Sequence, residues 1–167
     1  MLKSNQHSEQ LGPLIQAYPD AVVVMIHRDP VATIQSLLTM RGLAFKSSRK
    51  QLDIDVHVSY WVDRLERMLH RYIRDRHLVP DSQLVEVMFA DIVSDDVAGA
   101  CGVLERAGLD VTDDSIADIE AYMAAHPRGK AGRVVYDLEG DFGLTAGKLR
   151  QRFAFYTEQF DIQPEGR

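Results

Sequence analysis

The most constraining feature of this sequence is a short apolar run that meets a charged junction. Residues Ala21 to Ile26 are all apolar and mostly β-branched, and His27, Arg28, Asp29 and Pro30 follow at once. Such a continuous run is typical of a parallel strand that is buried on both faces. An Asp-Pro pair starts a helix well, because aspartate caps the free N–H groups and proline tolerates the first position. The pattern predicts a strand that leads directly into a helix.

Helical and strand patterns alternate along the rest of the chain. A long helical pattern runs from Asp53 to His77, and a second apolar run, Leu84 to Phe89, predicts another strand. Because a parallel pair needs a helical crossover, these elements favour an α/β fold. Further helices are expected over Asp96 to Arg106 and Asp113 to Ala125, and a last one begins after Thr145.

The expected helices have ends and buried faces that the spacing of residues defines. The helix after Pro30 should end at Gly42, since glycine commonly terminates helices. Apolar positions at steps of three and four mark the buried face of the two longest helical patterns. These positions are Trp61, Leu65, Met68 and Tyr72 in the first, and Leu149, Phe153, Tyr156 and Phe160 in the second.

The composition limits the class of protein. The chain has 167 residues, 46% of them hydrophobic, which is enough for one compact domain and too little for two ordinary ones. A net charge of −6 argues against a surface that attracts nucleic acid or anionic lipid as a whole. The single cysteine, Cys101, offers no disulfide framework, and the longest apolar run is too short to span a bilayer. We therefore expect a cytoplasmic protein without a membrane span.

The junction after the first strand is the strongest candidate binding site. Ligands of open parallel sheets bind beyond the carboxyl ends of the strands, where a helix N-terminus offers free N–H donors. Arg28 would add a guanidinium fork suited to phosphate, and the hydroxyl of Ser36 lies two turns into the helix. The alternative is a surface ion pair of Arg28 with Asp29 or Asp91. Ser36 would then lie on a solvated helix face.

Several segments of the chain have a distinctive order and spacing. They are Leu2-Lys3-Ser4 with His7 and Leu11, Tyr18-Pro19-Asp20-Ala21, His27-Arg28-Asp29-Pro30 with Ser36-Leu37, and the late loop His126-Pro127-Arg128-Gly129-Lys130 with Gly132-Arg133 and Tyr136. In this order and spacing the chain resembles the sulfotransferase family from about Leu2 to Ile162.

The resemblance implies a P-loop-NTPase-like parallel sheet flanked by helices, formed by one partial domain over residues 1–162 with a tail at 163–167. It implies that the donor substrate is 3′-phosphoadenosine 5′-phosphosulfate, with no metal. The residues that match the family's 3′-phosphate site are Arg28 and Ser36, and Arg128 and Lys130 of the late loop close over the same phosphate. Phe89 stands where the family often has a tyrosine against the adenine, and its ring can still pack on a base.

The resemblance also implies an enzyme that transfers the sulfuryl group in line to a hydroxyl acceptor. Lys3 and His7 match residues that lie beside the sulfuryl group and the acceptor. An imidazole can take the proton of the attacking hydroxyl, and an ammonium can neutralise the leaving oxygen. Many members place the histidine two residues after the lysine, where this chain has Asn5. The acceptor could be a hydroxyl-bearing small molecule, a lipid or a sugar.

One departure from the family concerns its opening strand, phosphate-binding loop and helix, which no segment of this sequence matches. We therefore expect a domain truncated at its N-terminal strand-loop-helix, which would leave part of the sheet uncovered. Such a chain would pair with a missing N-terminal half or form a homodimer. The alternative to the enzyme is a non-catalytic fragment of the same fold that binds nucleotide or oligomerises.

Four arginines at helical spacing, Arg64, Arg67, Arg71 and Arg74, could instead indicate a nucleic-acid surface. The interleaved Asp63, Glu66 and Asp75 favour a solvated, salt-bridged face, so we expect no nucleic-acid partner. No pair of histidines has the spacing of a zinc site on one helix.

Overall fold

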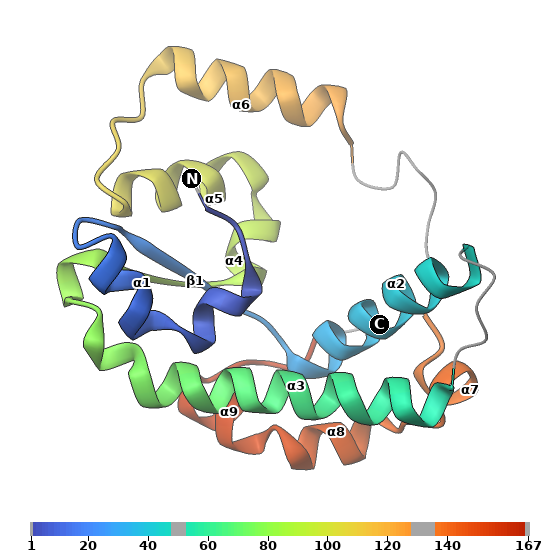
Figure 1. Ribbon diagram of the computed structural model, residues 1–167. Helices are drawn as coiled ribbons and strands as arrows, with labels where there is room; N and C mark the ends of the chain where they lie inside the picture. Colours follow the sequence, from blue (N-terminus) through green and yellow to red (C-terminus); the bar gives the residue numbers. More distant parts are fainter. Residues whose placement is uncertain (1, 48–52, 128–135, 166–167) are drawn as a thin grey trace. The chain divides into compact units, whose positions relative to one another are not determined.

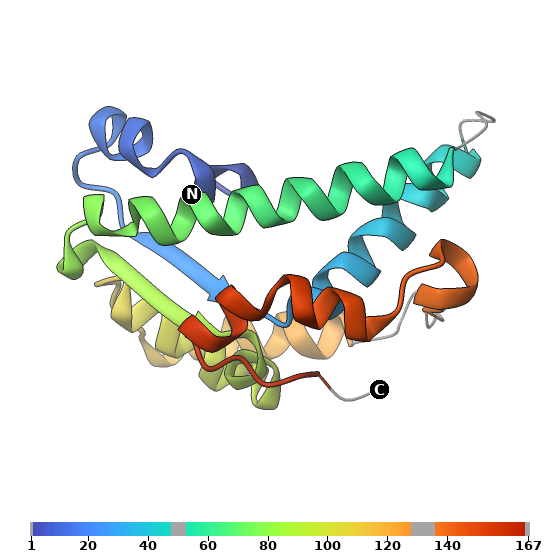
Figure 2. The same cartoon turned by 90° about the horizontal axis from the view of Figure 1, so that it is seen from below.

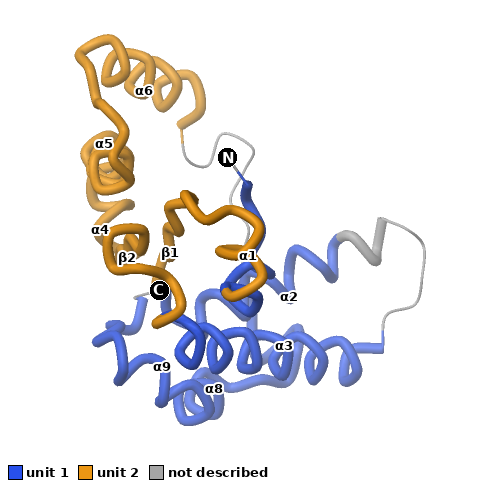
Figure 3. The backbone as a smooth tube through the Cα atoms, turned by 60° about the vertical axis from the view of Figure 1, so that its left-hand side comes forward, with its two compact units in different colours: residues 1–11, 28–76, 135–167 blue, residues 12–27, 77–134 orange. Residues whose placement is uncertain are grey.

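The computed structural model describes residues 2–47, 53–127 and 136–165, and the chain divides into two compact units (Figure 3). Unit 1 consists of residues 1–11, 28–76 and 135–167, and unit 2 consists of residues 12–27 and 77–134. The two units are described separately below. The expected domain over 1–162 with a tail at 163–167 stays a prediction.

A small parallel sheet lies in unit 2. Strand β1 spans Val23–His27, strand β2 spans Leu84–Met88, and the two run side by side in the same direction (Figure 2). Val23 pairs with Leu84 and His27 with Met88. The two predicted strands and their parallel pairing are confirmed. Strand β1 begins two residues later than the apolar run and ends one residue after it, at His27. The prediction that this strand is buried on both faces was wrong, because Val24 and Ile26 are exposed while the alternate residues Val23 and Met25 are half-buried.

The described residues of unit 2 also form helices. They are α1 (Leu11–Ala17), whose first residue lies in unit 1, α4 (Phe89–Ser94), α5 (Asp96–Arg106) and α6 (Asp113–Ala125), with a short 3-10 turn η3 (Asp81–Gln83) before β2. Another 3-10 turn, η2 (Arg76–Leu78), crosses the boundary between the units. The ends of α5 and α6 agree with the sequence, because their caps are local: Asp95 accepts from the N–H of Ala98, and Thr112 and Ser115 form a capping box. Phe89, which was expected to end the second strand, begins α4 instead.

Unit 1 is helical and is built along its longest helix. Its elements are η1 (Asn5–Glu9), α2 (Pro30–Ser47), α3 (Ile54–Asp75), α7 (Leu138–Phe142), α8 (Ala146–Arg152) and α9 (Ala154–Gln159). Helix α3 contacts η1, α2 and α7, while α8 contacts α2 and α9 (Figure 1). The fully buried side chains of this unit include Ile34, Leu38, Tyr72 and Phe153.

Three expectations about the helices of unit 1 were wrong in detail. Helix α2 continues through Gly42, because one glycine weakens a helix by only about 1 kcal/mol and the buried face of α2 outweighs that cost. On α3, Trp61 is only half-buried, beneath the guanidinium of Arg41, whereas Val62 is buried. The last helix is interrupted at Phe153, which separates α8 from α9.

The predicted aromatic face at the end of the chain is confirmed across this interruption. Leu149, Phe153 and Tyr156 are buried, and the ring of Phe160 packs against Tyr156 with centroids 5.1 Å apart. Among the helices of the described residues, none combines the length and the hydropathy that crossing a membrane requires.

Candidate functional site

The junction between β1 and α2 has the local structure that its sequence predicts. Arg28 follows the last residue of β1, and α2 begins at Pro30. Asp29 is buried, and its Oδ1 accepts a hydrogen bond of 2.8 Å from the N–H of Val31. Its carbonyl oxygen accepts from the N–H of Thr33 at 2.9 Å. Asp29 is therefore the cap of α2, and this cap holds the neighbouring Arg28 at the start of the helix.

The guanidinium of Arg28 forms a bidentate pair with a carboxylate from the far end of the chain. Its Nε donates to Oε1 of Glu165 at 2.7 Å, and its Nη2 donates to Oε2 at 2.8 Å. The sequence suggested Asp29 or Asp91 as the partner and missed Glu165, which is 137 residues away. No local pattern connects residues so far apart. Arg28 thus lies in a setting where its fork already binds an anionic group.

Neighbouring groups stabilise the charge on Arg28. The hydrogen bonds from its guanidinium to Glu165 raise the pKa of Arg28 the most, and the negative charge of Glu165, with smaller effects of Tyr136 and Asp29, raises it further against the effect of burial. The influence of Tyr136 places this described residue of the late loop within electrostatic reach of Arg28. Arg128 and Lys130, the residues predicted to bind from that loop, lie outside the described residues.

A second contact ties the same segment to the cap of α2. The backbone N–H of Glu165 donates to Oδ2 of Asp29 at 3.0 Å. One oxygen of Asp29 therefore caps the helix, and the other binds residue 165. Arg28, Asp29 and Glu165 form one cluster within unit 1, which we call the junction cluster.

Ser36 lies on α2, two turns from the junction cluster, and its side chain is half-buried. As the sequence predicted, Ser36 lies on the helix that follows Arg28. Arg28 lies just before α2 and Ser36 lies within it, and both belong to unit 1.

Lys3 and His7, the predicted catalytic residues, lie at the start of unit 1. Lys3 is exposed and precedes η1, and His7 is half-buried within η1. The hydroxyl of Ser4 accepts from the N–H of Gln6 at 3.2 Å and so caps this turn. The position of His7 is set by η1, which packs against α3.

A buried carboxylate at the end of η1 fixes that packing. Glu9 accepts hydrogen bonds from Nη1 of Arg64 at 2.6 Å and from Nη2 of the same residue, and Nη1 of Arg71 lies 3.3 Å from Oε2. The hydrogen bonds from Arg64 lower the pKa of Glu9, and the charges of Arg64, Arg71 and Arg67 add to this effect against burial. Two arginines of the predicted stripe therefore bind the segment that carries His7.

Two of the three acidic residues that were expected to neutralise the stripe bind an arginine of another helix, and the third binds a stripe arginine. Nη2 of Arg152 donates to Asp63 at 2.5 Å and to Glu66 at 2.6 Å, which joins α8 to α3. Arg74 binds its neighbour Asp75. The prediction of a salt-bridged face is confirmed, but the partners from other segments, Glu9 and Arg152, were missed because sequence spacing on one helix does not reveal a contact from another segment.

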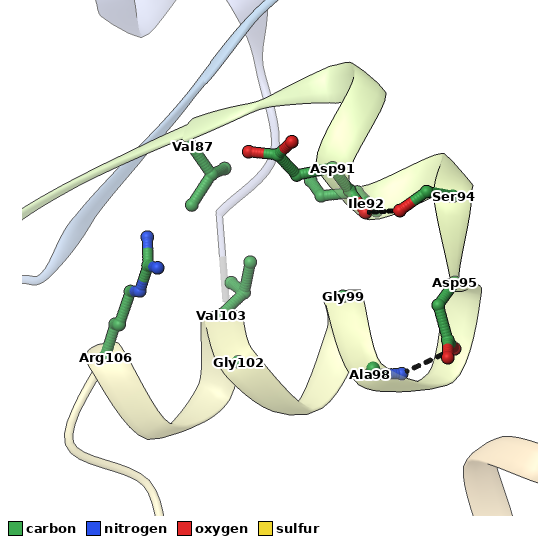
Figure 4. A pocket seen from close by; sticks show the side chains of 10 residues that line it. All are labelled: Val87, Asp91, Ile92, Ser94, Asp95, Ala98, Gly99, Gly102, Val103 and Arg106. Carbon is green, nitrogen blue, oxygen red and sulfur yellow. Dashed lines mark hydrogen bonds between the residues drawn. The ribbon is translucent and has the colours of Figure 1, made fainter.

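Unit 2 holds Phe89 and a separate pocket. Phe89 is half-buried at the start of α4. A cavity of about 270 Å³ lies between β2, α4 and α5, and its lining combines apolar side chains such as Val87 and Val103 with Asp91 and Arg106 (Figure 4).

Within the described ranges, no group of three or more His, Cys, Asp or Glu is arranged to hold a metal ion.

Comparison with known proteins gives consistent matches. The model of the sulfotransferase family matches residues 1–114. The structure is similar to that of sulfotransferase STF9 from Mycobacterium avium, with a TM-score of 0.80 and 26% identity over 99% of this chain and 43% of that one. It is also similar to sulfotransferase STF1 from Mycobacterium tuberculosis H37Rv, with a TM-score of 0.72 and 24% identity over 92% of this chain and 39% of that one. None of the curated proteins matches the sequence significantly. The chain thus spans less than half the length of these two sulfotransferases.

Proposed function

This chain belongs to the sulfotransferase family, and from that premise we propose that it binds 3′-phosphoadenosine 5′-phosphosulfate and serves the transfer of its sulfuryl group to a hydroxyl acceptor. The mixed α/β architecture with its small parallel sheet agrees with the fold of the mycobacterial sulfotransferases. The donor, the acceptor and the roles of individual residues are parts of the proposal.

The observation that carries the proposal is the bidentate contact at Arg28. A guanidinium that holds a carboxylate with two parallel hydrogen bonds can hold a phosphate in the same manner. The N-terminus of the 18-residue helix α2 follows directly and favours negative charge. We assign the 3′-phosphate of the donor to Arg28, with Ser36 as a further hydrogen-bonding group.

The remaining predicted residues keep the roles that the resemblance implies. Arg128 and Lys130 would neutralise the same phosphate, and Phe89 would pack against the adenine. The acceptor is a hydroxyl-bearing small molecule, lipid or sugar. In the transfer, the acceptor oxygen forms a bond to sulfur as the bond from sulfur to the 5′-phosphate oxygen breaks. His7 takes the hydroxyl proton, Lys3 neutralises the leaving oxygen, and adenosine 3′,5′-bisphosphate departs.

Calorimetric titration with adenosine 3′,5′-bisphosphate tests the donor site, since this ligand needs the 3′-phosphate contacts but no transfer. We expect binding that is lost in Arg28→Ala and retained in Arg150→Ala, which removes an exposed arginine of α8. Adenosine 5′-monophosphate, which lacks the 3′-phosphate, serves as the matched ligand and should respond little to Arg28→Ala. Equal affinity of the wild type and Arg28→Ala for the bisphosphate contradicts the assignment.

A second candidate function is that of a non-catalytic fragment that binds nucleotide or oligomerises. It is favoured by Val22, Val24 and Ile26, which alternate along and just before β1 and are all exposed. Apolar side chains at alternate positions share one face of a strand, and an exposed apolar face favours association. A chain that binds the bisphosphate, is dimeric by light scattering and transfers no sulfuryl group to phenolic, sterol or sugar acceptors would support this candidate.

A further inference from the structure

The junction cluster contains an internal anion at the position that the proposed function assigns to the donor. Glu165 binds Arg28 through both carboxylate oxygens, and its backbone N–H binds Asp29. Three hydrogen bonds thus hold one residue against the start of α2. The residue comes from the segment that follows α9, so the chain supplies its own occupant of this site.

The carboxylate uses a specific edge of the guanidinium. Glu165 accepts from Nε and from Nη2 of Arg28, which point in the same direction and form one face of the fork. A phosphate that binds two parallel N–H groups on this face needs the same donors. If it approached another face instead, it would bring a second anion beside Glu165 and Asp29, which is unfavourable. The carboxylate and the phosphate therefore exclude one another.

From this geometry we propose that the segment 163–165 is an internal competitor of the donor's 3′-phosphate, with Glu165 occupying Arg28 until nucleotide displaces it. The inference rests on the proposed function, because it needs Arg28 to be the 3′-phosphate site. It goes beyond that function in assigning a regulatory contact to a residue outside the predicted binding set.

The contact is suited to displacement. The side chains of Arg28 and Glu165 are 34% and 30% exposed, so water screens their attraction. A phosphate that carries more charge than a carboxylate, together with contacts of the rest of the nucleotide, can replace it. An exposed ion pair of about 0.2–1 kcal/mol leaves only part of the chains with a free Arg28, so the apparent affinity for nucleotide falls by about two- to sixfold.

The first test compares the affinities of the wild type and two variants for adenosine 3′,5′-bisphosphate. Glu165→Gln keeps the shape of the side chain but binds a guanidinium less strongly, so we expect binding up to about sixfold tighter than that of the wild type. Glu158→Gln, on the exposed surface of α9, makes the same chemical change at a distance from the cluster and should leave the affinity unchanged. Adenosine 5′-monophosphate should bind both variants equally.

The second test measures displacement itself, because a charge change near the site could also alter the affinity through space. The N–H of Glu165 is bonded to Asp29 in the free chain, so its hydrogen exchange, followed by NMR in the wild type, should accelerate when the bisphosphate saturates the site. An unchanged exchange rate at saturation overturns the proposal even if Glu165→Gln binds more tightly.

The outcomes separate this inference from the function on which it rests. Equal or weaker binding by Glu165→Gln, with binding still lost in Arg28→Ala, rejects the internal competitor and keeps the donor site. If neither the wild type nor Glu165→Gln binds the bisphosphate at millimolar concentration, the proposed function and the competitor both fall. Tighter binding together with faster exchange of the Glu165 N–H establishes the competitor.

Discussion

The carboxylate of Glu9 is held by both terminal nitrogens of Arg64, a residue 55 positions later in the chain. The side chain of Glu9 is only 3% exposed, against 22% for Arg64. Because Glu9 ends η1 and Arg64 lies on α3, this pair fixes the opening segment of the chain on the longest helix of unit 1. The same segment carries His7. The Glu9–Arg64 pair has no proposed role in the transfer, but it helps to position His7, the proposed general base.

Replacing Glu9 with glutamine should destabilise the chain. The variant retains the size of the side chain but leaves the guanidinium of Arg64 without its anion, so we expect the free energy of unfolding to fall by about 1–3 kcal/mol. Urea unfolding followed by circular dichroism measures this change. Glu120→Gln, on the exposed face of α6, should stay within about 0.5 kcal/mol of the wild type. A loss in Glu9→Gln no larger than that of the control contradicts the role of the pair.

The contribution of Glu9 should also depend on pH in a defined direction. Arg64 holds the pKa of Glu9 below its ordinary value, so the folded chain binds the proton of this carboxyl less readily than the unfolded chain does. The stabilisation is therefore complete above the unfolded pKa of about 4.3 and is lost as the pH falls through the lower folded value. The difference in unfolding free energy between the wild type and Glu9→Gln should shrink from about pH 5 downward, and urea titrations at several pH values test this. A difference in unfolding free energy that stays constant or grows as the pH falls contradicts this prediction.

Replacing Arg28 with lysine should weaken nucleotide binding although the positive charge is kept. A lysine provides a point charge on a flexible stem and cannot form two parallel hydrogen bonds, so we expect about a tenfold loss of affinity for adenosine 3′,5′-bisphosphate. Calorimetry measures the loss, and Arg150→Lys on α8 is the matched control. If Arg28→Lys binds as well as the wild type, charge alone explains the site and the fork of donors has no role.

Replacing His7 with alanine should slow transfer without affecting nucleotide affinity. Loss of a general base typically lowers turnover by about a hundredfold or more. The rate of sulfuryl transfer to a phenolic acceptor and the affinity for the bisphosphate are measured on the same preparations. His77→Ala, at an exposed position in η2, controls for the loss of an imidazole elsewhere. Unaltered turnover in His7→Ala would remove this residue from the mechanism.

Replacing Phe153 with alanine should strongly destabilise unit 1. Its side chain is fully buried where α8 meets α9, so truncation leaves a large cavity and should cost about 3–5 kcal/mol. Thermal unfolding measures the change. Phe155→Ala removes a half-buried ring that stacks on His70 and should cost less. If both variants lost the same stability, the burial of Phe153 would not explain its contribution to the stability of unit 1.

Local patterns predicted most of the secondary structure. The presence of the two strands, the cap at Asp29, and the limits of α5 and α6 depend on residues that are close together in the chain, and all were confirmed. Gly42 was misread because a local helix-breaking preference is weaker than the packing of a long buried face. Phe89 was placed in the second strand for a different reason. An apolar run alone does not mark the residue at which a strand ends and a helix begins.

The sequence by itself determined the family resemblance and the position of Arg28 at the end of a strand, because strand, cap and helix signals all lie within about twenty residues there. Only the tertiary structure decided what Arg28 and Glu9 bind. Glu165 reaches Arg28 across 137 residues, and Arg64 reaches Glu9 across 55. A charged side chain accepts any opposite charge that folding brings within a few ångströms, so its partner is a property of the packed chain rather than of its sequence neighbours.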